Sequence, residues 1–224
     1  MLTDSALGNA KLLKRRVRNQ LLGLAVSPLA LISRRGFLHD MGWYQSVRTQ
    51  RSIDLEGNPI PWWSYSFILF LRDRLNAQLR VFEFGSGNST LWLAPRVKSV
   101  ISIETDKEWY ERVRVAVPQN VELRYEEFVR DGNYCRMLEQ YPSQFDVIIV
   151  DAFDRVRCAK NAMAALNPGG VIIFDDASDA PFHDGPAFLV AHGFKRLDFI
   201  GTAPQQDATH CTTLFYRNEN CLGV

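Results

Sequence analysis

The clearest pattern in the chain is an alternation, beginning at residue 67, between short apolar runs and longer segments with apolar residues at helical spacing. The apolar runs predict strands at 81–84, 99–106, 120–128, 145–154 and 171–178. The segments around them predict helices at 67–79, 91–97, 106–117, 131–141, 155–166 and 186–193. Strands that alternate with helices favour an α/β fold, in which helices cover both faces of a parallel sheet.

Two further segments complete the predicted sheet. Residues 194–201 and 211–218 are strand-like and have no helix between them, so they predict an antiparallel pair. Residues 168–170, Pro-Gly-Gly, predict a turn before the strand at 171–178. We therefore expect a doubly wound, mostly parallel seven-stranded sheet within a main domain at 67–224.

Residues 1–66 lack this alternation and predict an N-terminal helical and loop extension with an aromatic cap. Residues 41–66 contain turn signals and are expected to form loop. Their aromatic residues either line a substrate pocket or pack the extension onto the core, and the sequence leaves both readings open. These residues are Trp43, Tyr44, Trp62, Trp63 and Tyr65.

The start of the extension is basic at 11–20 and apolar at 21–32. We expect it to pack on the domain or on a second subunit, which makes a homodimer one open arrangement. Peripheral contact with an anionic membrane through residues 11–35 is the other. A signal peptide is disfavoured because no small-residue cleavage site follows the apolar run.

Charge and composition argue against several classes of protein. The 26 basic and 25 acidic residues of this 224-residue chain nearly balance, so we expect no nucleic acid partner. The four cysteines show no Cys-x-x-Cys spacing, which argues against a zinc site and a disulfide framework and favours a cytoplasmic location. No apolar run reaches the roughly 18 residues that a spanning helix needs.

The most informative stretch is Val-Phe-Glu-Phe-Gly-Ser-Gly-Asn-Ser-Thr at 81–90. An alternating strand leads into Gly85 and Gly87, where a tight turn lets a ligand approach the backbone, and cap-forming residues then open a helix. The dinucleotide fingerprint fails because Thr90 stands at its third glycine. Glu83, two residues before the turn, would repel a pyrophosphate and attract a cationic ligand.

This stretch resembles motif I of the class I S-adenosylmethionine (SAM) methyltransferases, Glu/Asp-x-Gly-x-Gly-x-Gly, with Ser89 at the third glycine. The acids that close the second and fourth strands, the Pro-Gly-Gly turn and the terminal strand pair strengthen the resemblance over residues 67–218. It implies that Glu104 accepts hydrogen bonds from the ribose and that Glu83 holds the amino group. The full set of cofactor-binding residues that we expect is Glu83, Gly85, Ser86, Gly87, Asn88, Ser89, Glu104, Thr105, Tyr125, Asp151, Ala152 and Phe153.

Acidic residues also follow the fourth and fifth strands. Asp151, Asp175 and Asp176 resemble the divalent-cation ligands of catechol O-methyltransferase-like enzymes, but Asp154 stands where that family has a catalytic lysine. We therefore do not favour a metal. Asp151 and His183 are our candidate catalytic residues, with His183 as general base because its unperturbed pKa suits neutral pH. His210 precedes the last strand within reach of the pocket, and we assign it no role.

The sequence thus predicts SAM-dependent methyl transfer, to an oxygen of a small molecule or glycan. The oxygen preference rests on the aromatic cap, the balanced charge and the lack of an Asn-Pro-Pro-Tyr-like motif after the fourth strand. Two alternatives stay open at this point. One is an NAD(P)-linked oxidoreductase, and the other is a noncatalytic Rossmann-like binding protein that contacts a membrane or partner through its extension.

Overall fold

The computed structural model describes residues 36–224, and the predictions made for residues 11–35 lie outside them. Helix α3 (Phe37–Asp40) belongs to the first of two compact units, Met1–Met41, and is described by itself. The second unit, Gly42–Val224, contains everything that follows. No helix within the described part of the chain is long and apolar enough to cross a membrane.

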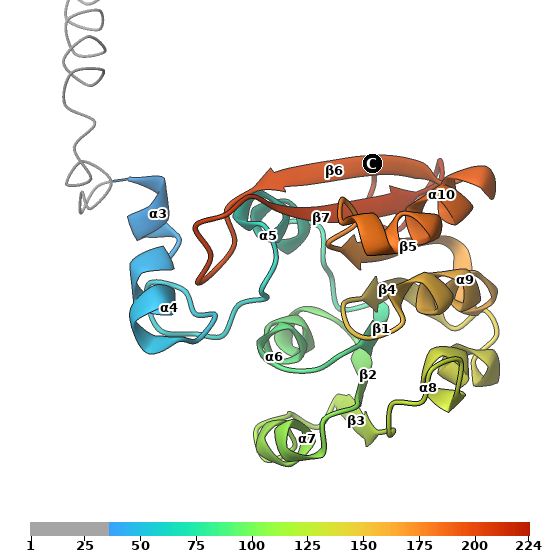
Figure 1. The fold of residues 1–224 in the computed structure, drawn as a ribbon, viewed down its shortest axis with the longest axis horizontal. Coiled ribbons are helices and arrows are strands. Elements are labelled where there is room, and N and C mark those ends of the chain that lie inside the picture. Colours follow the sequence, from blue (N-terminus) through green and yellow to red (C-terminus); the bar gives the residue numbers. More distant parts are fainter. Residues whose placement is uncertain (1–35) are drawn as a thin grey trace, which may run out of the picture. The chain divides into compact units, whose positions relative to one another are not determined.

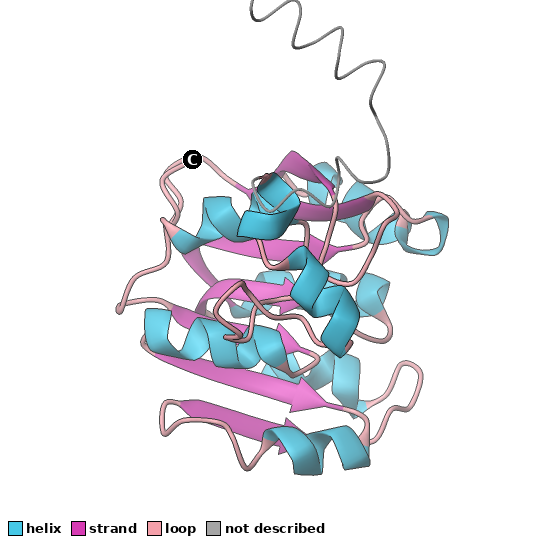
Figure 2. Cartoon of the chain, turned by 90° about the vertical axis from the view of Figure 1, so that its left-hand side faces the viewer, coloured by secondary structure: helices cyan, strands magenta, loops and turns pink. Residues whose placement is uncertain are grey.

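The second unit is built on a sheet of seven strands in the order β3-β2-β1-β4-β5-β7-β6 (Figures 1 and 2). Strands β1 to β5 are parallel, and β7 pairs antiparallel with both β5 and β6. The strands are β1 (Arg80–Phe84), β2 (Ser99–Glu104), β3 (Val121–Tyr125), β4 (Phe145–Val150), β5 (Leu166–Asp175), β6 (Lys195–Gly201) and β7 (His210–Tyr216). The predicted fold class is therefore confirmed.

Helices cover both faces of the sheet, as Figure 1 shows. One side carries α5 (Tyr65–Arg72), α6 (Asn88–Leu93) and α7 (Lys107–Val113). The other carries α8 (Asn133–Arg136), α9 (Arg155–Ala165) and α10 (Asp184–Ala191). The remaining helical segments are α4 (Trp43–Thr49), η1 (Ala94–Arg96), η2 (Met137–Gln140) and η3 (Ala180–Phe182).

The central strands are apolar because both of their faces are covered. Phe82, Phe84, Ile148 and Val150 are buried in one cluster with residues of α8, α9 and α10. Alanines on α9 let that helix approach the sheet closely, and Ala159 is fully buried there. This packing fixes the carboxyl ends of β1, β4 and β5 side by side at one edge, where an open α/β sheet binds its ligands.

Three element predictions were wrong. Residues 43–49 form helix α4 inside the predicted loop. The segment lacks helical periodicity but is held by long-range hydrogen bonds, such as the one that Trp43 Nε1 donates to the Gln206 carbonyl at 2.7 Å. Helix α5 ends at Arg72 rather than 79, since the Asn76 side chain accepts from the Gln78 amide and forms a turn instead. Residues 168–170 lie within β5, as an irregularity that shifts its register against β4.

The segment before α5 packs into the second unit. The Ser64 amide donates to Thr212 Oγ1 at 3.1 Å, and Trp63 is fully buried. A domain boundary at residue 67 stays a prediction.

Candidate functional site

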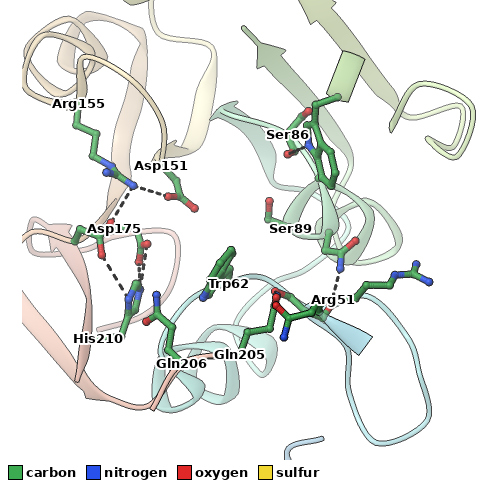
Figure 3. Close-up of a pocket in the computed structure, with 16 residues that line it drawn as sticks. Arg51, Trp62, Ser86, Ser89, Asp151, Arg155, Asp175, Gln205, Gln206 and His210 are labelled. Carbon is green, nitrogen blue, oxygen red and sulfur yellow. Dashed lines mark hydrogen bonds and ion pairs between the residues drawn. The ribbon is translucent and has the colours of Figure 1, made fainter. Parts of the chain in front are cut away.

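Two cavities open at the carboxyl edge of the parallel strands. The larger has a volume of about 540 Å³ and lies between the turn after β1, the ends of β4 and β5, the start of β7 and the segment before α5 (Figure 3). The smaller, of about 190 Å³, lies between the turn after β1 and the ends of β2 and β4. Ser86, Ser89 and Asp151 line both cavities, so the two form neighbouring parts of one site.

The turn after β1 can be built only with glycine at its first position. Gly85 has φ +97°, and a Cβ there would lie 2.9 Å from the Asp151 carbonyl oxygen. Gly87 has φ +150°, and its amide donates to Thr90 Oγ1 at 3.0 Å, which starts α6. Trp109 lies beside the turn, and its Nε1 donates to the Ser86 carbonyl at 2.8 Å. The result is a half-buried turn whose residues line the two cavities.

Glu83 holds this turn in place through buried hydrogen bonds. Its Oε2 accepts hydrogen bonds from Thr90 Oγ1 at 2.6 Å and from Ser102 Oγ at 3.0 Å, and the residue is 1% exposed. Burial raises the pKa of Glu83 to about 7, although the neighbouring hydroxyl groups lower it. The carboxylate therefore ties the turn to α6 and β2, and its contact with a ligand amino group stays a prediction.

Replacing Glu83 by Gln should remove a pH dependence of stability. The folded pKa near 7 exceeds the unfolded value of 4.5, so the folded protein binds the proton more tightly and loses stability as pH rises from about 4.5 to 7. That loss is of the order of 3 kcal/mol. Urea unfolding at pH 5 and pH 8 should show a loss of stability that is smaller in E83Q than in the parent protein, because Asp151 and Asp176 still contribute in both; equal pH dependence in both would contradict the assignment.

Glu104 ends β2 at the mouth of the smaller cavity. Its Oε2 accepts from the Ser86 amide (3.2 Å) and from Ser86 Oγ (2.7 Å). Its Oε1 accepts from the amides of Thr105 (2.8 Å) and Asp106 (2.9 Å). These donors fix the carboxylate in place beside the glycine turn, where it can exchange the Ser86 hydroxyl for hydroxyl groups of a ligand.

A cluster of charges closes the other end of the larger cavity (Figure 3). Arg155, the first residue of α9, bridges two carboxylates through one nitrogen, which lies 2.9 Å from Asp151 Oδ1 and 3.0 Å from Asp176 Oδ2. The second oxygen of Asp151 accepts from Trp63 Nε1 at 3.0 Å. Both Asp151 oxygens are thus engaged, and the protein supplies its own cation between the two carboxylates.

His210 lies between Asp175 and Asp176. Its Nε2 is 2.9 Å from Asp175 Oδ1, and its Nδ1 is 3.4 Å from Asp176 Oδ1. Thr212 also donates to Asp175 at 2.6 Å. Burial lowers the pKa of His210, but the hydrogen bond with Asp175 and the nearby carboxylates outweigh it and raise the pKa above its ordinary value. The two carboxylates therefore favour the protonated form of His210.

The pKa values of the carboxyl groups Asp151 and Asp176 are also raised, which for an acid favours the neutral form. Burial and the charge of Asp175 raise the pKa of Asp151 to about 8, against Arg155 and Trp63, which lower it. Burial and Asp175 likewise raise the pKa of Asp176, against Arg155 and His210. Raised carboxyl pKa values beside a cavity are typical of groups that exchange protons during catalysis.

Comparison with known proteins identifies the domain. Residues 82–177 match a family model described as a methyltransferase domain. Residues 82–177 thus form a methyltransferase domain of the SAM-dependent kind. This match overturns the oxidoreductase alternative. No curated protein sequence matches the chain.

Solved methyltransferase structures share the fold. The tRNA methyltransferase TrmI from Aquifex aeolicus is 17% identical, with 67% of each chain covered and a TM-score of 0.50. Precorrin-6y C5,15-methyltransferase from Geobacter metallireducens is 13% identical, with 68% of this chain and 87% of the other covered and a TM-score of 0.53. At such identities the likeness shows the fold alone. Since one of the two acts on tRNA, the expected absence of a nucleic acid partner has no support from these relatives.

The methyltransferase offers SAM a site of fitting chemistry. The smaller cavity combines the carboxylate of Glu104 with Phe153, which is 58% exposed and gives an apolar face beside it. The turn at Gly87 lines the larger cavity, where we expect it to face the amino-acid moiety. The two cavities together match a ligand with a nucleoside at one end and an amino acid at the other.

Replacing Glu104 by Ala should weaken SAM binding about 10- to 150-fold, the effect of losing a hydrogen bond to a charged group (~1.5–3 kcal/mol). Isothermal titration with SAM measures it. The matched control is E122A, because Glu122 is an exposed acid on the neighbouring strand β3, paired with Arg124. An unchanged affinity in E104A, or an equal loss in E122A, would remove Glu104 from this role.

The predicted site residues fall into two groups. All the expected cofactor-binding residues except Tyr125 line one cavity or the other. Tyr125 lines neither, and its ring lies 5.9 Å from that of Tyr110. His183 is exposed, lines neither cavity, and bonds to the Ser178 carbonyl at 2.9 Å, so the structure does not bring it together with Asp151.

A metal site does not fit well at Asp151 and Asp176, because the Arg155 guanidinium already bridges these carboxylates. Asp175, Asp176 and His210 do lie close enough to share an ion among the described residues. His210 Nε2, however, is already hydrogen-bonded to Asp175, so this pair would have to separate for an ion to bind.

Sequence reasoning gave no role to His210, Arg155 or Trp62. A signal for His210 was present: β7 is antiparallel to β5, so its first residue lies at the edge where the parallel strands end. Arg155 follows directly on the acids after β4. Trp62 was only one of several aromatic residues with an open interpretation.

Proposed function

We propose that this methyltransferase methylates an oxygen atom of a small molecule or glycan, with Asp176 as the residue that accepts the acceptor's proton. The observation that carries the proposal is the larger cavity, which joins the glycine turn on one wall to the buried carboxylate cluster on the other. An acceptor held in this cavity lies between the two.

SAM, when bound, supplies a methyl group on a sulfonium: the acceptor oxygen forms a C–O bond as the C–S bond breaks, and the electron pair stays on sulfur. The chain's own task is to hold the hydroxyl group in line and to take up its proton. The proton passes to a carboxylate oxygen of Asp176, and product release returns it to solvent.

Asp176 suits this task better than its neighbours. Both oxygens of Asp151 are engaged at 3.0 Å or less, whereas among the described residues Asp176 Oδ1 has only His210 Nδ1 at 3.4 Å. Its side chain is 27% exposed to the cavity. Its backbone has φ +57°, an unfavourable conformation for a residue with a side chain, and such conformations cluster at functional sites.

Asp151 then acts as a positioning residue, because it holds Arg155 and Trp63 in place beside Asp176. His210 stabilises the ionised carboxylates of Asp175 and Asp176. A homodimer and a membrane contact through residues 11–35 stay open parts of this proposal.

The test is to incubate the protein with methyl-labelled SAM and a panel of probe acceptors: methyl glycosides, phenols, primary amines and short RNA. We expect label in a methyl ether. Label recovered on nitrogen or RNA, or no label on any probe although S-adenosylhomocysteine binds, would contradict the proposed acceptor atom.

A further inference from the structure

The larger cavity contains an exposed aromatic side chain that the fold does not need. Trp62 is 47% exposed, whereas its neighbour Trp63 is fully buried. Pro61 is also buried, so the backbone here is held on both sides of Trp62. In Figure 3 the indole of Trp62 lies between the cluster at Arg155 and the turn at Ser89. An exposed tryptophan in such a place indicates a contact surface for a ligand.

The rest of the cavity wall is polar. No aliphatic side chain lines it among the described residues, and apart from Gly87 only Trp62 and Trp109 lack a charged, amide or hydroxyl side chain. Trp109 is already bonded to the glycine turn. Trp109 therefore lies at the turn where we expect the cofactor, and Trp62 is the exposed aromatic side chain of the wall away from that turn.

Amide side chains flank Trp62. Gln50, Gln205 and Gln206 line the cavity beside it. The backbone of Gln206 is fixed by Trp43, and its side-chain amide has no hydrogen-bond partner within the described residues. An amide offers one donor side and one acceptor side, which suits hydroxyl groups, since these both donate and accept.

We propose, on the basis of the function proposed above, that the acceptor is a carbohydrate whose ring packs on the face of Trp62 and whose hydroxyl groups bond to the surrounding amides and carboxylates. A sugar ring presents C–H bonds on its face and hydroxyl groups on its rim. The positive edges of the C–H bonds suit the negative face of an aromatic ring. The hydroxyl groups around the ring then bond to the polar wall of the cavity, so both the face and the edge of the sugar have partners.

Other acceptor classes fit less well. A flat phenol would bury polar wall groups without hydrogen bonds, which is costly. A phosphate would meet the carboxylates of Asp151, Asp175 and Asp176, and two of the cations in the wall, Arg155 and His210, are already paired with them. Arg51 alone would be left to bind it among the described lining residues. The volume of about 540 Å³ lies within the usual range for small-ligand sites and has room for a sugar beside the amino-acid end of SAM.

The experiment measures binding of methyl hexopyranosides, in the presence of saturating S-adenosylhomocysteine, by isothermal titration and saturation-transfer NMR. Short oligosaccharides of the same sugars separate a free sugar from a glycan chain, and catechol and a primary amine serve as comparison ligands. We expect at least one glycoside to bind, with the strongest transfer to protons on one ring face.

Three variants assign the contact. W62A should lose at least about 10-fold in glycoside affinity, W62F should regain most of it, and W62L, of similar apolar character without an aromatic face, should not. Binding of S-adenosylhomocysteine should stay unchanged in all three, which also reports correct folding.

The outcomes separate the two proposals. If S-adenosylhomocysteine binds but every glycoside fails, or if catechol or the amine binds instead, the carbohydrate proposal is overturned and methyl transfer stands. Equal glycoside binding in W62F and W62L also overturns it. If S-adenosylhomocysteine itself does not bind, the proposed function fails first.

Discussion

Replacing Asp176 by Asn is expected to lower kcat by about 10²- to 10⁴-fold, the usual contribution of a positioned general base. Asparagine keeps the shape of the side chain but cannot take up the proton of the acceptor. The affinity for SAM should stay unchanged, because Asp176 lies at the end of the site away from Glu104. The measurement is single-turnover methyl transfer at saturating SAM, with SAM affinity determined separately.

The pH profile adds a second readout. Because burial and Asp175 raise the pKa of Asp176, the rate of the parent enzyme should fall as pH decreases through a value above that of an ordinary aspartate. D176N should lack this acid limb. The control is D179N, since Asp179 is an exposed acid three residues further on. Activity near the parent level in D176N, or an equal loss in D179N, would show that Asp176 is not the base.

Replacing Arg155 by Met is expected to destabilise the fold by roughly 3–5 kcal/mol, as when one partner of a buried ion pair is removed. The guanidinium is 14% exposed and bridges Asp151 and Asp176. Without it, the pKa values of both carboxyl groups rise further. The folded state then binds protons more tightly than the unfolded state over a wider pH range. The free energy of unfolding therefore falls further as pH rises.

Urea unfolding at pH 5.5 and pH 8 tests this, and the loss in R155M should be larger at pH 8. The matched control is R157M on the same helix, whose arginine is 39% exposed and pairs with Asp154. There we expect a much smaller loss, because solvent screens an exposed ion pair. Equal effects of the two substitutions, or a smaller loss at pH 8 in R155M, would contradict a stabilising role for the Arg155 bridge.

The sequence predicted the parts of the site that are local in the chain. Gly85 and Gly87 could be recognised because the turn, its strand and its helix are consecutive, and Glu104 because it ends the next strand. The parts that it missed depend on tertiary contacts. Arg155 and His210 have partners at the ends of β4 and β5, and the sequence does not specify the directions of those side chains.

The position of His183 and the unexpected helix α4 have the same origin. His183 follows β5 closely in sequence, but the short helix η3 (Ala180–Phe182) precedes it, and its ring bonds back to the Ser178 carbonyl. Helix α4 has no apolar stripe to announce it and is held by bonds such as Ser46 Oγ to the Ile53 carbonyl at 2.8 Å. Hydrophobic periodicity predicts helices and strands that bury one regular face. It does not predict segments that are held by individual polar contacts.

A crystal structure of the protein with S-adenosylhomocysteine tests the central claim most directly. The account predicts ribose hydroxyl groups on the carboxylate of Glu104, the amino-acid end against the backbone from Gly85 to Ser89, and the sulfur facing the cavity that Asp176 lines. A ligand bound elsewhere, or a turn closed by its own side chains while Glu104 keeps its bonds to Ser86, would contradict it.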